Sequence, residues 1–440
     1  MNIKRKIAIA AVPAVMALAS TSVDSKILLM SQEGWEVSFD GAANAFIMKN
    51  SVSNIPDSSG GTGNIAFDTY GAVAGTNSHD DTSIVTGLLP NVWGMTLKAP
   101  TANGLDVSMR LGLYTHMNGG ENSLGNGQIN IRETSGSVAG SFGTVLVGRS
   151  LGIHQSNAIL NDMLLFGVGA AASAGNSNTT LGRIGLGYLY TDFKPQISWT
   201  LPGMDALAGN FGAKIGIFDP DDIVADTAAL SATDKSSPRV EAQISYTGGI
   251  GDLGVNLWVD GSYQNTERNE NEASSRTAIV DADGTANETH DRDTDVDSAG
   301  VGFGTKLSYQ GFAIVASGFY GTAMGIRGQH ATGAAGANGA LDDVGTARNS
   351  YGGYLQGTYD FGQGTSAGYS YGGNCLVRTG NDIQTRGVMN CQTMHSGMIW
   401  HNVTDNFRLV AEGGYTEKTW YLADSDQEDS FGGVGAFFFW

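Results

Sequence analysis

The histidines are the side chains best suited to acid–base or metal chemistry near neutral pH, and the sequence has 7 of them. None stands in a recognisable Ser-His-acid arrangement, and none forms a His-x-x-x-His pair that could hold zinc. His395 and His401 share one face of a single strand if their segment is extended. The histidines therefore argue against a barrel enzyme, and we expect neither a cofactor nor a metal centre.

A second set of candidate ligands lies in the acidic stretch 264–297. Its aspartates could offer oxygen ligands to a hard cation such as calcium: Asp281, Asp283, Asp291, Asp293, Asp295 and Asp297. The later bidentate Glu of a helix-loop-helix calcium site is missing, so we interpret the stretch as a solvated surface loop. Calcium bridging to lipopolysaccharide phosphates is the alternative.

The N-terminus has the pattern of a removable export signal. Lys4, Arg5 and Lys6 precede the apolar run 7–19, which ends in the small-x-small sequence Ala17-Leu18-Ala19. The run is too short for a membrane-spanning helix, which needs about 20 apolar residues. We therefore predict a signal peptide over 1–19, a leader over 20–34 without strand partners, and one barrel domain over 35–440.

Export places the only two cysteines, Cys375 and Cys391, where disulfides persist. Their separation suits a clip across one surface loop, although two free thiols are the alternative. The formal net charge of -19 argues against a nucleic-acid partner, because binding a polyanion requires clustered Lys and Arg.

The composition and the residue pattern favour many short strands. The chain has 64 Gly, and each interior Gly of a helix costs roughly 1 kcal/mol relative to Ala. Over 105–116 apolar and polar residues alternate, with Arg110 on the polar face. The same period returns at 211–217, 240–246, 253–259, 301–309, 312–316 and 407–415. Tight turns at 309–311 and 404–406 contrast with long insertions at 219–237, 264–297, 322–349 and 417–429.

The final segment, 429–440, ends the chain on an aromatic residue. Trp440 and Phe438 share one face with Ala436 and Val434, so this strand could close a barrel against the first one. Strands of about 9 to 12 residues fit a tilted membrane crossing. The sequence thus predicts an all-β fold, a transmembrane antiparallel β-barrel of roughly sixteen strands. A large soluble sandwich is the alternative.

The stretch 131–190 resembles the constriction region of the Gram-negative general porins, a family of trimeric outer-membrane diffusion porins. That family has a Phe-Gly-x-x-x-x-Gly-Arg pattern, found here at 142–149, before a long loop. The segment 161–167, Asn-Asp-Met-Leu-Leu-Phe-Gly, is similar to the acidic part of that loop. Gly182-Arg183 matches the Gly-Arg that opens the next strand in the family.

The resemblance implies a third loop that narrows the pore and a row of wall arginines facing its acids. By matching position, Arg132, Arg149 and Arg183 would form the basic side and Asp162 the acidic side. Strand alternation points Arg132 and Arg183 inward and adds Arg110, whereas Arg149 would need a strand end or bulge to turn it. The family's second loop acid is replaced by Leu165.

We therefore expect an outer-membrane porin for passive diffusion of small hydrophilic solutes and ions. A substrate-specific channel and a barrel-anchored adhesin or phage receptor are the alternatives. The net charge predicts a mild cation preference, while the arginine row argues locally for anions. The expected partners are outer-membrane lipid and lipopolysaccharide, the transported solutes, the barrel-assembly machinery, and two further copies in a homotrimer.

Overall fold

The computed structural model describes most of the chain, in twelve ranges. These are 26–53, 79–117, 129–170, 179–225, 231–268, 279–280, 286–287, 295–330, 339–342, 345–384, 388–421 and 426–440. The predicted signal peptide, 1–19, lies outside them, as do Asp281, Asp283, Asp291 and Asp293 of the acidic stretch.

Sixteen antiparallel strands form a closed β-barrel, which confirms the predicted fold class. They are β2 (Trp35–Val52), β4 (Asn91–Lys98), β5 (Asp106–Thr115), β6 (Asn130–Gly140), β7 (Gly143–Leu151), β8 (Phe193–Thr200), β10 (Gly209–Phe218), β11 (Arg239–Ile250), β12 (Leu253–Glu267), β15 (Asp295–Tyr309), β16 (Phe312–Thr322), β17 (Asn349–Gly362), β18 (Thr365–Val377), β19 (Met389–Thr404), β20 (Phe407–Trp420) and β21 (Gln427–Phe439). Each strand pairs with the next along the chain, and β21 returns to pair with β2.

Shorter elements complete the described chain. They are β1 (Ile27–Gln32), β3 (His79–Val85), β9 (Met204–Ala206), the pair β13 (Ile279–Val280) and β14 (Ala286–Asn287), helix α1 (Ser156–Asn161), and the 3-10 helices η1 (Met163–Phe166) and η3 (Asn381–Gln384). Among the described residues, no helix has the length and apolar character needed to cross a membrane.

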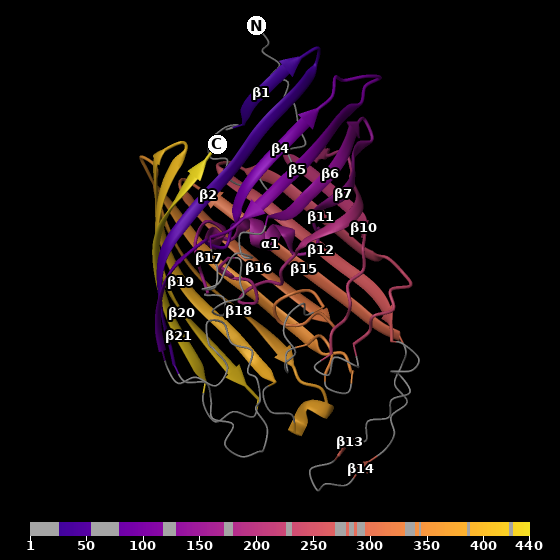
Figure 1. Cartoon of the computed structure of the whole chain (residues 1–440), viewed down its shortest axis with the longest axis vertical. Helices are drawn as coiled ribbons and strands as arrows, with labels where there is room; N and C mark the ends of the chain where they lie inside the picture. The colour runs from indigo at the N-terminus through magenta and orange to yellow at the C-terminus, as the bar shows by residue number, and fades with distance from the viewer. Residues whose placement is uncertain are drawn as a thin grey trace.

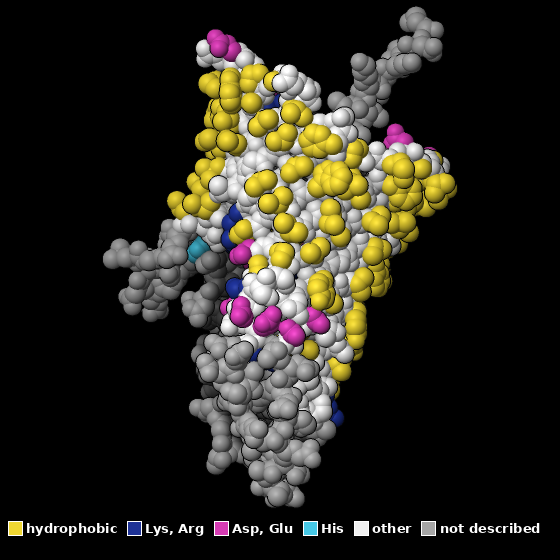
Figure 2. Space-filling view, turned by 90° about the vertical axis from the view of Figure 1, so that its right-hand side faces the viewer, with side chains coloured by type: hydrophobic (Ala, Val, Ile, Leu, Met, Phe, Trp, Pro, Cys, Tyr) yellow, Lys and Arg dark blue, Asp and Glu magenta, His cyan; other side chains and the backbone are white. Residues whose placement is uncertain are grey.

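The two-residue period of the strands sorts side chains between the outside and the lumen. On β11, Val240 and Ile244 point outward and are 38% and 64% exposed, whereas Arg239 and Glu241 point inward and are fully buried. Figure 2 shows hydrophobic side chains spread over one side of the outer wall, with acidic side chains gathered towards its lower end. An apolar outer wall with a polar interior is what a barrel in a bilayer requires.

The N-terminal leader corrects one expectation. Residues 20–34 were expected to lie unpaired, but β1 pairs antiparallel with β2 from Ile27 opposite Phe39 to Gln32 opposite Trp35. The hairpin turns through Glu33 and Gly34, both with positive φ. β1 thereby pairs with the edge of β2 between Trp35 and Phe39, a part of β2 that β21, which pairs from Ala42 onwards, leaves free.

The C-terminal residue closes the barrel. The Gly41 amide donates to the Trp440 carbonyl at 2.9 Å, and the Trp440 amide donates back to Gly41 at 3.1 Å. The Trp440 ring lies 4.8 Å from the Trp93 ring and 5.9 Å from the Phe39 ring, centre to centre. Trp440 thus contacts β2 through backbone pairing and through the Phe39 ring, and contacts β4 through the Trp93 ring.

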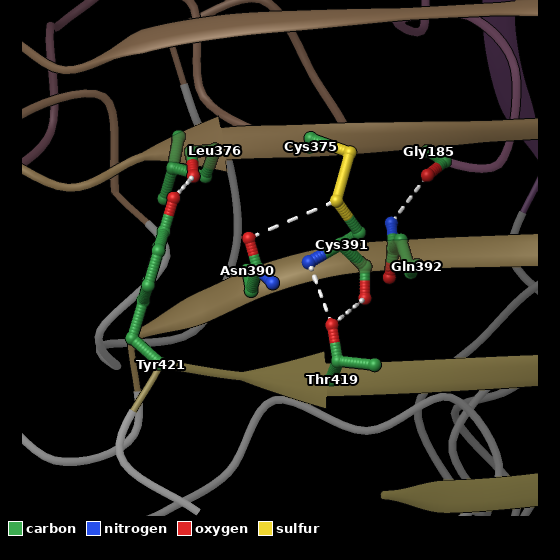
Figure 3. Close-up of a disulfide and its surroundings, with 8 residues drawn as sticks. All are labelled: Gly185, Cys375, Leu376, Asn390, Cys391, Gln392, Thr419 and Tyr421. Atoms are coloured by element: carbon green, nitrogen blue, oxygen red, sulfur yellow. Dashed lines mark hydrogen bonds between the residues drawn. A yellow bond between two sulfur atoms is a disulfide. The ribbon is translucent and has the colours of Figure 1, made fainter.

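Cys375 on β18 and Cys391 on β19 face each other across the two strands and form a disulfide. Figure 3 shows the bond beside Gln392, which lies on the opposite face of β19 and reaches the Gly185 carbonyl inside the barrel. The disulfide closes the base of the loop between β18 and β19, across a sequence separation of 16 residues.

Candidate functional site

The segment 152–192 connects β7 to β8 and folds into the barrel; we call it the pore loop. Figure 1 shows its helix α1 surrounded by the strands near the middle of the barrel. The loop turns into α1 at Gln155, which has a positive φ of 64°. Asp162 then caps η1, where its carboxylate accepts the Leu164 amide at 3.1 Å. Of the loop, residues 171–178 are not described.

Apolar packing holds one side of the pore loop to the wall. Leu164 and Leu186 are fully buried in a cluster with Phe46 of β2, Met394 of β19 and Phe437 of β21. Burying such a side chain contributes about 1.5–3 kcal/mol. Leu165, which stands where the general porins commonly carry a second loop acid, is buried in a neighbouring cluster with α1. At that position the loop is therefore held by hydrophobic contact.

Three inward carboxylates of the wall accept backbone amides of the pore loop. Glu241 accepts the amides of residues 153 and 154 at 2.6 and 2.9 Å, and Asp260 accepts that of Gln155 at 2.9 Å. Glu412 accepts the amides of residues 168 and 169 at 2.7 and 3.0 Å. A carboxylate that accepts several N–H groups makes the stronger, charge-assisted kind of hydrogen bond. Glu241 and Asp260 therefore hold the loop at its start, and Glu412 holds it near its middle.

Neutral wall side chains add further contacts to the loop. They bond to its carbonyls and amides: Tyr354 to Ala158, Gln356 to Asn161 and Met163, Asn374 to Tyr188, and Gln392 to Gly185. Because backbone groups away from water must find a partner, these side chains let an irregular segment occupy the interior. The pore loop is thus built into the wall rather than suspended across an open lumen.

Asp162 and Arg183 lie close together, but both are inside the loop. The Arg183 Nε lies 3.9 Å from Asp162 Oδ1, and the Tyr188 hydroxyl donates to Asp162 Oδ2 at 2.9 Å. Burial raises the pKa of the Asp162 carboxyl and holds that of Tyr188 well above its usual value. Arg183 also reaches Ser370 on β18. The Asp162–Arg183 ion pair therefore stabilises the fold of the pore loop from within.

The prediction that Gly182-Arg183 opens the next strand is wrong. β8 begins at Phe193, and Gly182 takes part only in isolated bridges within the loop. The strand-like alternation of residue types over 183–190 has no counterpart in burial, because residues 183–189 are all buried, Arg183 and Leu189 as fully as Leu186 and Tyr188. Arg183 is consequently not a wall arginine.

Arg110 lies on the inner face of β5, as its alternation predicts. Its guanidinium contacts both oxygens of Asp40 on β2, at 2.6 and 2.9 Å, and its Nε lies 3.3 Å from Glu133 on β6. All three side chains are buried. Two carboxylates therefore balance the charge of Arg110, and the three side chains link β2, β5 and β6.

Arg132 and Arg149 stand together at the base of the pore loop. Arg132 donates to the Tyr190 hydroxyl at 3.3 Å and lies over the Tyr114 and Phe193 rings. Burial raises the pKa of Tyr190 to about 12, and the charges of Arg132 and Arg149 oppose that rise. β7 continues to Leu151 and pairs without a register shift at Arg149, so the strand end or bulge expected there is not found. Gly148, which precedes Arg149, has a φ of 126°, a value that glycine adopts readily.

A larger ionic network lies beyond the loop on β8, β11 and β12. Glu241 contacts Lys194 Nζ at 3.0 Å and Arg239 Nη2 at 2.7 Å. The buried His154 of the loop places its Nδ1 2.6 Å from Asp260. None of these residues was singled out as functional, although alternation places Arg239, Glu241 and Asp260 on the lumen side of their strands. That inward charge was the signal available in the sequence.

His330 joins this network from the segment after β16. Its Nδ1 lies 3.5 Å from Asp221 and its Nε2 2.8 Å from Ser298 Oγ, an order that resembles a catalytic triad. Ser298 and His330 have no exposed surface, and Ser298 donates to the carbonyls of Thr322 and Ala323. A substrate could not reach this hydroxyl, so we assign the group a structural role. The described residues contain no cluster of three or more His, Cys, Asp or Glu able to hold a metal.

A fall in pH is expected to destabilise the folded segment that contains His330. Burial lowers its pKa to about 4, from an ordinary value of 6.5, with Arg239 and Lys194 adding to the effect and Asp221 opposing it. The unfolded segment therefore takes up a proton that the folded one refuses, and stability falls as pH drops from about 6.5 to 4, by up to about 3 kcal/mol. Above that window this contribution is constant.

Hydrogen exchange of residues 323–330, corrected for intrinsic rates, measures this loss between pH 7 and pH 4.5. The variant His330→Asn keeps a polar side chain but does not titrate, so its protection should change less over the same range. Equal protection of the wild type at both pH values would show that His330 is not the titrating group.

Comparison with known proteins gives matches in structure alone. No protein-family model matches the sequence, and no curated protein matches it. The structure resembles the outer-membrane channel DcaP of Acinetobacter baumannii, with a TM-score of 0.60 and 15% identity over 94% of this chain and 99% of that one. The fold is that of outer-membrane porins.

Two further solved structures share this porin fold. The anion-selective porin from Comamonas acidovorans has a TM-score of 0.56 and 12% identity, covering 92% of this chain and 100% of that one. Pseudomonas putida OprB has a TM-score of 0.50 and 8% identity, covering 91% and 94%. At such identities the comparisons establish the common architecture of these porins and this chain.

Proposed function

We propose that this chain is a porin of the bacterial outer membrane that lets small hydrophilic solutes and ions diffuse passively. The observation that carries the proposal is a closed barrel of sixteen strands with an apolar outside and a loop folded within. A barrel of this size is too wide for its wall side chains to fill, so an aqueous path follows. Such a path needs no catalyst, because solutes move down their own gradients and are selected by diameter and lining polarity.

A channel specific for one solute class is the second candidate. Arg348, beside β17, is buried against Asp382 at 2.6 Å and donates to the carbonyls of Gly339 and Leu341. Leu341 in turn packs against Ile223 in a buried apolar cluster. Segments from different loops are therefore held together at the end of the barrel opposite the termini, which favours a defined entrance.

Liposome swelling with a graded series of uncharged sugars tests the channel and separates the two candidates. We expect rates that fall with solute size at every concentration, as passive diffusion requires. A saturable rate, blocked by one solute class, would favour the specific channel. Vesicles that exclude even the smallest sugar would contradict both and favour the barrel-anchored adhesin or receptor.

The same proposal extends to site residues and partners. We propose that Arg132 and Arg149 belong to the constriction, whereas Arg110, Arg183 and Asp162 hold its walls and loop in place. We further propose a homotrimer in contact with lipid and lipopolysaccharide, inserted by the barrel-assembly machinery. Three equal conductance steps from one inserted particle would support the trimer.

A further inference from the structure

The inward carboxylates at mid-barrel are occupied by partners within the protein. Six of them are buried and bonded to cations or to N–H groups: Asp40, Glu133, Asp162, Glu241, Asp260 and Glu412. Asp192, at the base of the pore loop, is partly exposed and accepts the Phe193 amide at 2.6 Å. Inward acids that are well exposed lie at strand ends, as Glu36, Asp106 and Asp360 do.

Several inward cations of the described chain, unlike most of the six buried acids, have no charged partner. Within the described residues, five of them lack a carboxylate oxygen within 4.0 Å: Arg132, Arg149, Lys214, Lys306 and Arg408. All five are partly exposed. At mid-barrel the six acids above are therefore covered, whereas these five positive groups stay in reach of a solute.

These five cations are distributed around the lumen. They come from β6, β7, β10, β15 and β20. Alternation places Arg132, Lys214, Lys306 and Arg408 on the inner face, and the charge of Arg149 acts on the buried Tyr190 of the pore loop. Arg132 and Arg408 lie at the edges of the pore loop: Arg132 bonds to Tyr190, and the Arg408 guanidinium lies 5.1 Å from the Phe166 ring centre. Lys214 and Lys306 stand on the wall of other strands. A solute that passes the loop must therefore move among positive side chains.

We propose that the channel selects small anions, carboxylates and phosphates included, over cations of the same size. The inference rests on the proposed diffusion channel and names its solute class. Charges on low-dielectric walls focus their field into the lumen and raise the local concentration of counter-ions. The net charge of -19 acts mainly elsewhere, because exposed charges are screened beyond about 8 Å at physiological ionic strength. The preference is therefore opposite to the one that net charge alone predicts.

Reversal potentials of the purified protein in a planar bilayer, under a potassium chloride gradient, test the proposal. We expect chloride to permeate at least about threefold better than potassium, with the ratio falling as salt rises. The triple variant Arg149→Gln, Lys214→Gln and Lys306→Gln should bring the ratio close to that of free diffusion. It spares Arg132 and Arg408, which contact the pore loop.

The control is Lys49→Gln, because Lys49 lies on the outer face of β2 with 65% of its side chain exposed. It removes one positive charge outside the lumen and should leave the ratio unchanged. A conducting wild-type channel that prefers potassium would overturn the anion inference and leave the diffusion channel intact. A conducting triple variant with the wild-type ratio would also overturn it. The absence of conductance in the wild type would overturn the proposed function as well.

Discussion

Replacing Glu412 by alanine is expected to free the middle of the pore loop and raise single-channel conductance. In the folded protein its carboxylate accepts the amides of Val168 and Gly169 and the hydroxyl of Ser396, at 2.7, 3.0 and 2.9 Å. Without it these donors are buried and unsatisfied, at about 1–3 kcal/mol each. In the variant, a loop position away from the wall becomes more favourable, because water can then hydrate these donors. The path through the barrel therefore widens.

The barrel itself should remain intact in this variant, since every strand pair of β20 is made by backbone atoms. We expect an increase in conductance of about twofold or more, with noisier open levels, because passage depends on pore diameter. Adding Glu241→Ala, which removes the acceptor of the amides at 153 and 154, should increase the effect.

Two variants make this prediction specific. Glu412→Gln keeps one acceptor oxygen at the same place and should show a smaller change. Glu36→Ala removes an exposed carboxylate at the far end of β2, away from the pore loop, and should conduct like the wild type. An unchanged conductance in Glu412→Ala, with the protein folded, would show that this acid does not hold the loop.

Deleting residues 437–440 is expected to abolish the closed barrel. The deletion removes the pairing of β21 with Ala42, Ala43 and Asn44 and the two backbone bonds between Trp440 and Gly41. The lost backbone partners would face hydrocarbon, where each unsatisfied group costs several kcal/mol. Trp440→Ala, which removes only the ring contacts, should be milder and lower the unfolding temperature.

Migration of unheated protein on a denaturing gel measures this outcome, because a closed barrel resists unfolding until it is heated. The truncated chain should migrate as unfolded at all temperatures. Phe361→Ala removes an aromatic ring that is 61% exposed on the outer face of β17, and it should keep the folded band. A heat-sensitive folded band from the truncated chain would show that the barrel closes without these residues.

Much of the fold could be predicted from the sequence, because β-strands at a membrane obey a local rule. The alternation at 240–246 and at 407–415 matches β11 and β20, and Trp440 stands at the closing seam. β1 was missed because its sequence, ILLMSQ, has no alternation: all its residues are exposed and it pairs on one side only. β1 is a strand because it pairs with β2, and its own sequence pattern does not show this.

The site was harder to predict, because its geometry depends on contacts between distant segments. Asp162 was predicted to lie on the pore loop, whereas Arg183 was expected on the wall; that both lie in the loop and close to each other depends on how the loop folds. Glu412 lies 244 residues from the amide of Val168 that it accepts, and no local spacing encodes that distance. The position of the loop could be predicted from the sequence. The wall acids that bind it could not, because they lie far from it along the chain.

The most direct test of the central claim is single-channel recording of the purified protein in a planar lipid bilayer. We predict stable openings whose current is proportional to voltage over a moderate range, as for a water-filled pore. Protein that inserts as a heat-modifiable barrel yet passes no current would contradict the claim, since the pore loop would then close the lumen.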